Sequence, residues 1–121
     1  MTVLQGDARI SSDIENTIED VDAVISVLGT DQTTVLTEAT AYIVSEMENS
    51  DITRVITIGT AGILTSRVDS GLLRYQSSES KRKSNTAAKE HHKGYDIVKE
   101  SLLDWTIMSS RYYESNEVCI I

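Results

Sequence analysis

The sequence predicts an α/β domain built on a parallel sheet, and three observations support this prediction. Short apolar runs alternate along the chain with longer segments of helical periodicity. The two inner runs, residues 23–28 and 54–59, are rich in β-branched residues, which is typical of strands buried on both faces. Glycine or turn-forming residues follow each run. Since strands that alternate with helices usually join a parallel sheet, we expect four strands with flanking helices.

The first elements are short. Residues 2–5 form an apolar run that ends in a turn, and we expect a strand there. Ser12 and Glu15 have the spacing of a capping box, a hydroxyl followed three residues later by a carboxylate. A helix is therefore expected over about 12–20, before the strand at 23–28.

The later elements have clearer patterns. Apolar residues at helical spacing predict a long amphipathic helix over about 33–48, before the strand at 54–59. Residues 60–85 have no clear period and are rich in serine, glycine and charge, so we expect a long loop with at most a short helical turn. A further helix is expected over about 86–103, followed by a last strand at 104–108.

Composition and charge exclude several classes of function. The formal net charge is −8, which disfavours nucleic acid and anionic membrane surfaces as partners. No apolar run approaches the ~20 residues of a membrane span. The single cysteine, Cys119, allows no internal disulfide and no cysteine-based metal site. We expect a cytoplasmic protein with no metal site and a small-molecule substrate.

Four segments carry a resemblance to a known family. They read TVLQGD, VDAVISVLG, TTVLTEATAYIVSEM followed by ITRVITIGTAG, and ESLLDWTIM. Together they resemble the atypical short-chain dehydrogenases/reductases, in particular the NmrA-like NAD(P)-binding proteins and the biliverdin-IXβ (flavin) reductases. The segments cover most of residues 2–112, in the order of the family's strands 3 to 6. The resemblance implies a Rossmann-like, doubly wound parallel sheet, with NADP or NAD as the cofactor.

The sequence departs from the family at its start. The family's glycine-rich strand-turn-helix, which holds the cofactor pyrophosphate, is absent. We therefore expect residues 1–121 to form a single incomplete NAD(P)-binding Rossmann-like domain. In the doubly wound order 3-2-1-4-5-6 the strand at 23–28 would lose its neighbour. We favour the interpretation that the chain is a fragment of a longer protein. The alternatives are that residues 2–5 repack beside that strand, or that a second copy in a homo-oligomer covers it.

Ligands of such sheets bind beyond the carboxyl ends of the strands, which locates the expected cofactor site. By resemblance, Gly6 and Asp7 contact the adenine, although a plain Gly-Asp turn is the alternative. The residues after the strand at 23–28 would line the ribose and nicotinamide, and Gly59 would let a ring approach the backbone. The predicted cofactor-binding residues are Gly6, Asp7, Ser26, Val27, Leu28, Gly29 and Gly59.

A Tyr-xxx-Lys pair lies on the helix at 86–103, but it is out of register with the family. The family's catalytic lysine precedes the aspartate of LDWTI by about thirteen residues, and counting back from Asp104 reaches His91. Tyr95 and Lys99 lie two turns later, so we expect Tyr95 to be a core residue. Biliverdin-IXβ-type reductases resemble this chain in having a histidine there. His91 is thus a catalytic candidate, the alternative being an ordinary helix histidine; His92 is the less favoured candidate.

Thr60 is the second catalytic candidate. It follows the strand at 54–59 and by resemblance takes the place of the family's active-site serine or threonine. Its hydroxyl could bond a substrate carbonyl or the nicotinamide carboxamide, or it could simply cap a turn.

These residues indicate an NAD(P)-dependent oxidoreductase that passes hydride to a carbonyl, quinone or flavin-like acceptor. One alternative is a non-catalytic NAD(P)-sensing protein of the NmrA-like kind, which the missing Tyr/Lys pair favours. Another is a truncated product without cofactor affinity.

Overall fold

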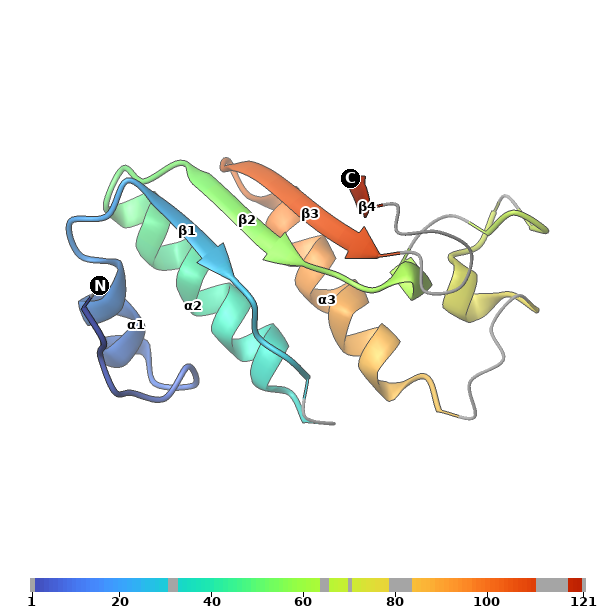
Figure 1. Ribbon diagram of the computed structural model, residues 1–121, viewed down its shortest axis with the longest axis horizontal. Coiled ribbons are helices and arrows are strands. Elements are labelled where there is room, and N and C mark those ends of the chain that lie inside the picture. Colours follow the sequence, from blue (N-terminus) through green and yellow to red (C-terminus); the bar gives the residue numbers. More distant parts are fainter. Residues whose placement is uncertain are drawn as a thin grey trace.

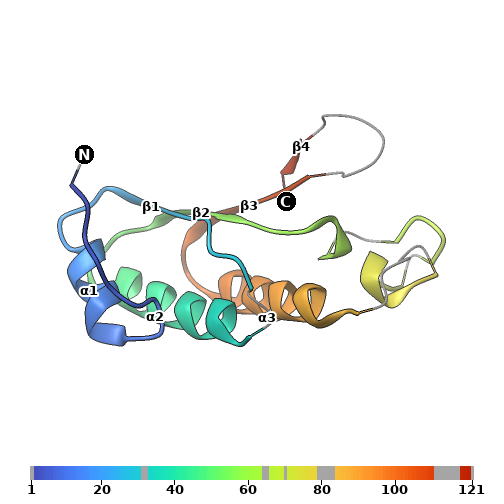
Figure 2. The ribbon, with the colours of Figure 1, turned by 60° about the horizontal axis from the view of Figure 1, so that its bottom comes forward.

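The computed structural model describes residues 2–30, 33–63, 66–69, 71–78, 84–110 and 118–120. These residues form two layers, a sheet and a set of α-helices packed on one of its faces (Figures 1 and 2). The α/β class and the parallel sheet predicted from the sequence are confirmed.

The sheet has the spatial order β1-β2-β3-β4. Strands β1 (Ala23–Ser26), β2 (Arg54–Ile58) and β3 (Asp104–Ser110) are parallel, and β4 (Val118–Ile120) pairs antiparallel with β3. All three parallel strands lie where the sequence predicted strands, at 23–28, 54–59 and 104–108. Because they are parallel, their carboxyl ends meet at one edge of the sheet, where a ligand is expected.

The α-helices are α1 (Ser11–Ile18), α2 (Val35–Asn49) and α3 (Thr86–Glu100). Two short 3₁₀ helices, η1 (Ala61–Ile63) and η2 (Arg74–Gln76), lie in the predicted loop. The helices match their predicted positions to within a few residues, but the capping box at α1 is wrong. Ile10 is the N-cap and makes no side-chain cap bond.

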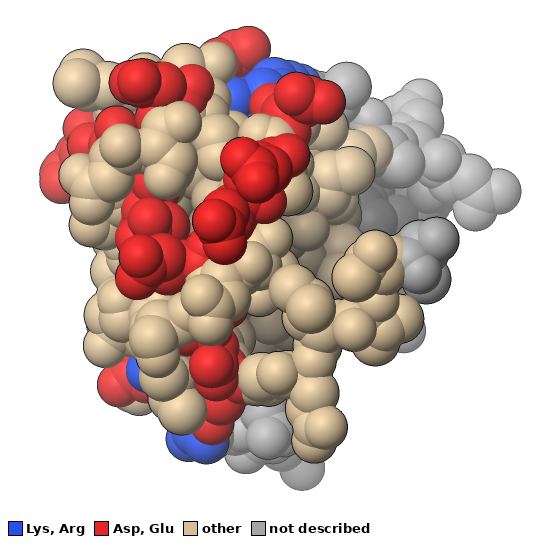
Figure 3. Space-filling model, turned by 90° about the vertical axis from the view of Figure 1, so that its left-hand side faces the viewer, with Lys and Arg blue, Asp and Glu red and all other residues tan. Residues whose placement is uncertain are grey.

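Acidic side chains cover much of one side of the molecule. Figure 3 shows the side with α1 and the N-terminal residues, where Asp and Glu predominate over Lys and Arg. This distribution accords with the net charge of −8. In the described part of the chain, no helix has the length and apolarity needed to cross a bilayer, and no group of three or more acidic, His or Cys side chains is arranged to hold a metal ion.

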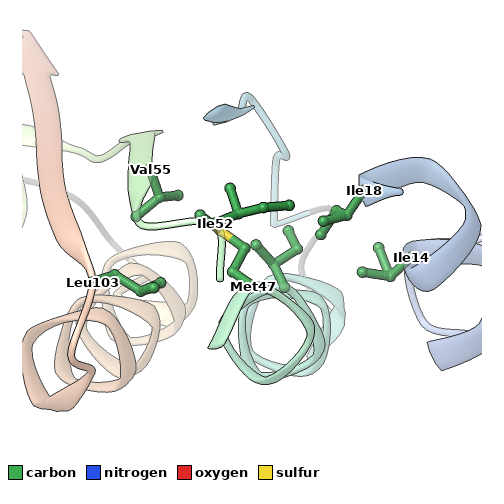
Figure 4. Close-up of a cluster of buried hydrophobic side chains, with 7 residues drawn as sticks. Ile14, Ile18, Met47, Ile52, Val55 and Leu103 are labelled. Atoms are coloured by element: carbon green, nitrogen blue, oxygen red, sulfur yellow. The ribbon is translucent and has the colours of Figure 1, made fainter. Parts of the chain in front are cut away.

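The largest core cluster lies between the sheet and the helices α1 and α2 (Figure 4). It is centred on Met47, which is fully buried on α2. The helical spacing of apolar residues on α2 explains this burial, because it directs one face of the helix at the sheet. The members are Ile14, Ile18, Ile43, Met47, Ile52, Val55 and Leu103.

The strands are not buried on both faces, contrary to the prediction. Ile25 of β1 is 68% exposed, and Val27 just beyond it is 72% exposed. The reason is visible in Figure 2, where α1, α2 and α3 all lie on the same side of the sheet. Within the described residues the other face of the sheet carries no helix, so alternate strand side chains stay in solvent.

The predicted strand at 2–5 is also wrong. These residues have no regular structure, and Val3 and Leu4 are 81% and 59% exposed. Among the described strands, β1 pairs only with β2. Repacking of residues 2–5 beside β1 is therefore not observed. An extended segment without a neighbouring strand has no partners for its backbone groups, and apolar composition alone does not make it a strand.

Candidate functional site

The residues after β1 lie open at the carboxyl edge of the sheet. The strand ends at Ser26, and the side chain of Leu28 turns back against the core cluster. Val27 points outward, and a methyl group added at Gly29 would meet no atom of the described residues within 4 Å. The four predicted cofactor residues from Ser26 to Gly29 thus form one segment at this edge. Leu28 packs against the core cluster, and Gly29 leaves space beside its backbone.

The end of β2 lies beside the end of β3. The N–H of Gly59 donates to the carbonyl of Met108 over 2.8 Å, which extends the parallel pairing one residue past the strand. Thr60 follows, half-buried, and its hydroxyl oxygen accepts a hydrogen bond from the N–H of Gly62 at 3.4 Å. This is the turn-capping role given above as the alternative. The hydroxyl proton of Thr60 is not used in that bond.

His91 projects from α3 into a small cavity that it shares with Gly59. The cavity has a volume of about 10 Å³, enough for about one water molecule. Burial lowers the pKa of His91, although the adjacent Glu90 acts in the opposite direction. The imidazole is therefore mainly neutral at pH 7, able to donate one hydrogen bond and accept another. The cavity is lined by Leu36, Thr40, Thr57, Ile58, Gly59, Ile63, His91, Gly94, Tyr95 and Ile107.

Asp7 begins a turn that leads into α1, in which the N–H of Ile10 donates to the Asp7 carbonyl at 3.0 Å, and Gly6 directly precedes this turn. The Asp7 carboxylate pairs with the guanidinium of Arg9 at 3.2 Å, and the hydrogen bond from Arg9 lowers the pKa of Asp7. The N–H of Asp7 donates to Asp13 Oδ2 at 2.9 Å. A Cβ at Gly6 would lie 3.1 Å from Asp13 Cβ, so a larger residue there would require Asp13 to shift. An adenine amino group would compete with Arg9 for this carboxylate, and the adenine contact stays a prediction.

Tyr95 and Lys99 form a packed pair on α3. The ring of Tyr95 meets Trp105 of β3 edge-to-face, with centroids 5.9 Å apart. The Lys99 ammonium lies 5.7 Å from the Tyr95 ring centroid. The half-buried Tyr95 ring is thus held between β3 and its own helix, as expected for a residue that packs.

A polar chain that the sequence did not reveal joins the long loop to α3. The hydroxyl of Tyr75 on η2 lies 2.7 Å from His92 Nδ1. His92 Nε2 lies 3.6 Å from Asp96 Oδ2, one helical turn further along α3. Only the four-residue spacing of His92 and Asp96 was available as a signal, because the segment that contains Tyr75 has no period.

A second residue missed from the sequence is Glu90, which is 4% exposed on α3. Its carboxylate accepts hydrogen bonds from the hydroxyl and, at 3.3 Å, the N–H of Thr37. Thr37 lies in the first turn of α2, where N–H groups have no partner inside the helix. Lys93 lies 3.7 Å from the same carboxylate. Glu90 therefore caps the first turn of α2 from α3.

The sequence model of the NAD(P)H-binding family matches residues 1–117. The fold is similar to that of a short-chain dehydrogenase/reductase from Veillonella parvula (TM-score 0.71, 18% identity, 94% of this chain and 49% of that chain). A second structure of a short-chain dehydrogenase/reductase from the same organism, in complex with NADP, has a TM-score of 0.68 and 19% identity, and the match covers 96% of this chain and 50% of that chain. A proposed epimerase from Bacteroides thetaiotaomicron has a TM-score of 0.68 and 23% identity, and the match covers 86% of this chain and 48% of that chain. No curated protein sequence matches. The chain spans about half the length of these solved structures.

Proposed function

The chain belongs to the NAD(P)H-binding family, and we propose that it supplies the nicotinamide side of the site of an NAD(P)-dependent oxidoreductase. The acceptor would be a small molecule with a carbonyl, quinone or flavin-like group. The observation that carries the proposal is the open segment from Ser26 to Gly29, which lies at the same sheet edge as Gly59 and Thr60. The family binds NAD(P)H, which agrees with the expected cofactor, NADP or NAD.

The open segment fits a flat ring. Gly29 leaves free space beside its backbone, and Ser26 offers a hydroxyl at the end of β1. When bound there, the nicotinamide would supply a hydride to the acceptor. The protein's contribution is to hold the two reacting carbons together and to exclude competing reactions.

Thr60 and His91 would orient the acceptor. The unused hydroxyl proton of Thr60 can be donated to a carbonyl oxygen. His91 is kept mainly neutral by burial, so it is suited to hydrogen bonding of a substrate oxygen or a ribose hydroxyl rather than to carrying a positive charge.

A non-catalytic NAD(P)-sensing protein is the second candidate. The observation that favours it is the contact of Tyr95 with Trp105, which engages the tyrosine of the Tyr-xxx-Lys pair on α3 in packing. Such a protein would bind the cofactor without turning it over.

The third candidate, a product without cofactor affinity, concerns the 121 residues alone. They contain no glycine-rich strand-turn-helix for the pyrophosphate. We expect these residues by themselves to bind NADPH with a dissociation constant above about 1 mM, because backbone N–H groups at such a turn carry most of the phosphate recognition. Titration calorimetry that gave a micromolar constant would contradict this expectation.

The function is tested with the protein expressed from its whole coding region. NADPH and NADH oxidation is followed with quinones, flavins and aldehydes as acceptors. Thr60→Ala and His91→Asn should each lower kcat/KM by about tenfold or more, because each removes a hydrogen bond to a reacting or positioned group. Thr17→Ala, at an exposed hydroxyl bonded to its own helix, serves as the control. Cofactor binding without reduction of any acceptor would favour the sensor.

Partners and location follow from charge and composition. We propose that nucleic acid and anionic membranes are not partners, because the face in Figure 3 would repel phosphates. A homo-oligomer that covers the free edge of β1 and a cytoplasmic location complete the proposal.

A further inference from the structure

We propose that Tyr75 donates the proton to the oxygen of the reduced substrate, and that His92 and Asp96 restore that proton from solvent. This inference rests on the proposed oxidoreductase function and adds to it a proton donor. Tyr75 and Asp96 were not among the candidates found in the sequence, where His92 was the less favoured alternative to His91.

The three side chains form a continuous polar chain. Tyr75 Oη and His92 Nδ1 are 2.7 Å apart, and the two rings meet edge-to-face at 5.7 Å. The Asp96 carboxylate, 3.6 Å from Nε2, favours the tautomer that carries its proton on Nε2. In the neutral imidazole Nδ1 then accepts the Tyr75 hydroxyl proton, whereas in the imidazolium Nδ1–H donates to Tyr75 Oη and leaves the hydroxyl proton free. A carboxylate, an imidazole and a hydroxyl in this order are the arrangement used to move protons in many enzymes.

The polar series of Tyr75, His92 and Asp96 begins next to the proposed substrate site. A side-chain carbon built on Gly62 would lie 3.4 Å from Tyr75 Cβ and 3.7 Å from Thr60 Cγ2. Tyr75 and Thr60 therefore flank the same glycine just beyond β2. His92 lies in the first half of α3, and the N-terminal half of a crossover helix faces the carboxyl ends of the parallel strands.

The polar series of Tyr75, His92 and Asp96 reaches solvent at its Asp96 end. The exposed fraction of the side chain rises from 29% at His92 to 55% at Asp96. Tyr75 is half-buried, and its hydroxyl also accepts a bond from Gln76 Nε2 at 3.4 Å. Protons can thus enter at the solvent-exposed side of the imidazole, while Tyr75 is anchored beside Gly62.

The proposed step balances in atoms and charge. As the carbonyl carbon gains a hydride, its π electrons move onto oxygen, and the Tyr75 hydroxyl gives that oxygen a proton. The C=O group is reduced to an alcohol and the nicotinamide is oxidised. The reacting form has His92 protonated, so that its Nδ1–H donates to Tyr75 Oη and the Tyr75 hydroxyl proton is free for the substrate oxygen. As that proton leaves, the Nδ1 proton passes to the Tyr75 oxygen, and the neutral His92 then takes a proton from solvent, with the nearby Asp96 carboxylate stabilising the cation.

The hydrogen bond is tested first by ¹⁵N NMR of ring-labelled histidine in the protein from the whole coding region. Tyr75→Phe removes one oxygen and keeps the ring, so it should shift the His92 Nδ1 resonance and leave His91 unchanged. Tyr42→Phe, a tyrosine on α2 that is 36% exposed, is the matched control and should shift neither. An unchanged His92 resonance in Tyr75→Phe would overturn the relay.

Kinetics test the role. Tyr75→Phe should lower kcat by about 10²-fold, the usual contribution of a general acid, with NADPH affinity unchanged. His92→Asn should lower kcat with little effect on KM, and it should add no further loss in the Tyr75→Phe background, because residues that act as one unit are non-additive. Full additivity would show that His92 only supports the loop, and would overturn its role.

The two proposals fail in different ways. If the wild-type protein reduces acceptors and Tyr75→Phe is as active as Tyr42→Phe, the relay is overturned and the oxidoreductase function stands. If the wild-type protein binds NADPH and reduces no acceptor, the oxidoreductase function fails and the relay fails with it.

Discussion

The two flanks of α3 meet different kinds of neighbour. On the flank that faces α2, Glu90 caps the first turn of that helix, and Gly94 lies against Thr40 and Leu36. On the flank that faces the loop, His92 bonds Tyr75 and extends toward water. The first flank joins two regular helices through close backbone approach, and the second fastens an irregular segment through side-chain polar groups.

This difference separates two consecutive histidines. Successive residues on an α-helix point about 100° apart, so His91 enters the cavity by Gly59 while His92 faces η2. Burial keeps His91 mainly neutral and suits it to orienting a ligand. His92 has the hydroxyl and carboxylate partners that a proton relay requires. The neighbours of each ring, more than the residue type, determine what it can do.

The largest expected effect on stability concerns the flank that faces α2. Glu90→Ala leaves the N–H of Thr37 without its partner and should lower the free energy of unfolding by about 1–3 kcal/mol. Glu90→Gln keeps an acceptor and should cost less. Glu100→Ala, exposed at the end of the same helix, is the control. Urea unfolding measures all three, and equal values for Glu90→Ala and Glu100→Ala would contradict the capping role.

Substitutions at two glycines test how much space for a side chain each flank of α3 leaves. Gly94→Ala places a methyl 3.6 Å from Thr40 Oγ1, an ordinary contact, and should stabilise α3 by about 0.5–1 kcal/mol because alanine is the better helix residue. Gly62→Ala places a methyl 3.3 Å from Ala88 Cβ and 3.4 Å from Tyr75 Cβ. It should destabilise the loop contact. Thermal unfolding gives the sign of each change, and two stabilising values would show that the loop flank is not tightly packed.

The smallest expected effect is a pH dependence. The pKa of His91 is lower in the folded protein than in the unfolded chain, where it is near 6.5. Below that value the unfolded chain takes up a proton that the folded protein resists, so this contribution to stability is complete above about pH 7 and is lost as the pH falls. His91→Gln should therefore flatten the change in unfolding free energy between pH 7 and pH 5. An unaltered slope would show that the ring is hydrated.

Periodic patterns predicted most of the fold. The apolar residues at helical spacing that include Met47 located α2, and the β-branched runs located β1 and β2. These predictions succeeded because the burial of apolar side chains in the core is the main force that stabilises these elements. The strand at residues 2–5 failed since a strand needs a neighbour that local sequence does not specify. Burial on both faces of the sheet failed for a similar reason, because the described helices all lie on one side.

The site was predicted unevenly. Residues Ser26 to Gly29 and Gly59 lie at the carboxyl edge of the sheet as expected, because the ends of parallel strands share one edge, and their cofactor contacts stay a prediction. Counting from Asp104 located His91, which does line a cavity with Gly59. Tyr75 was not found, since its partner lies 17 residues away and the intervening segment has no period.

The sequence by itself determined the alternation of strands and helices, the family, and the segments that reach the carboxyl edge of the sheet. Only the tertiary structure decided that Glu90 caps α2, that His91 and His92 face different neighbours, and that Tyr75 meets His92. The physical reason is one of range. Hydrophobic spacing and turn chemistry act within a few residues, whereas contacts between elements depend on how helices cross and on the path that a loop takes.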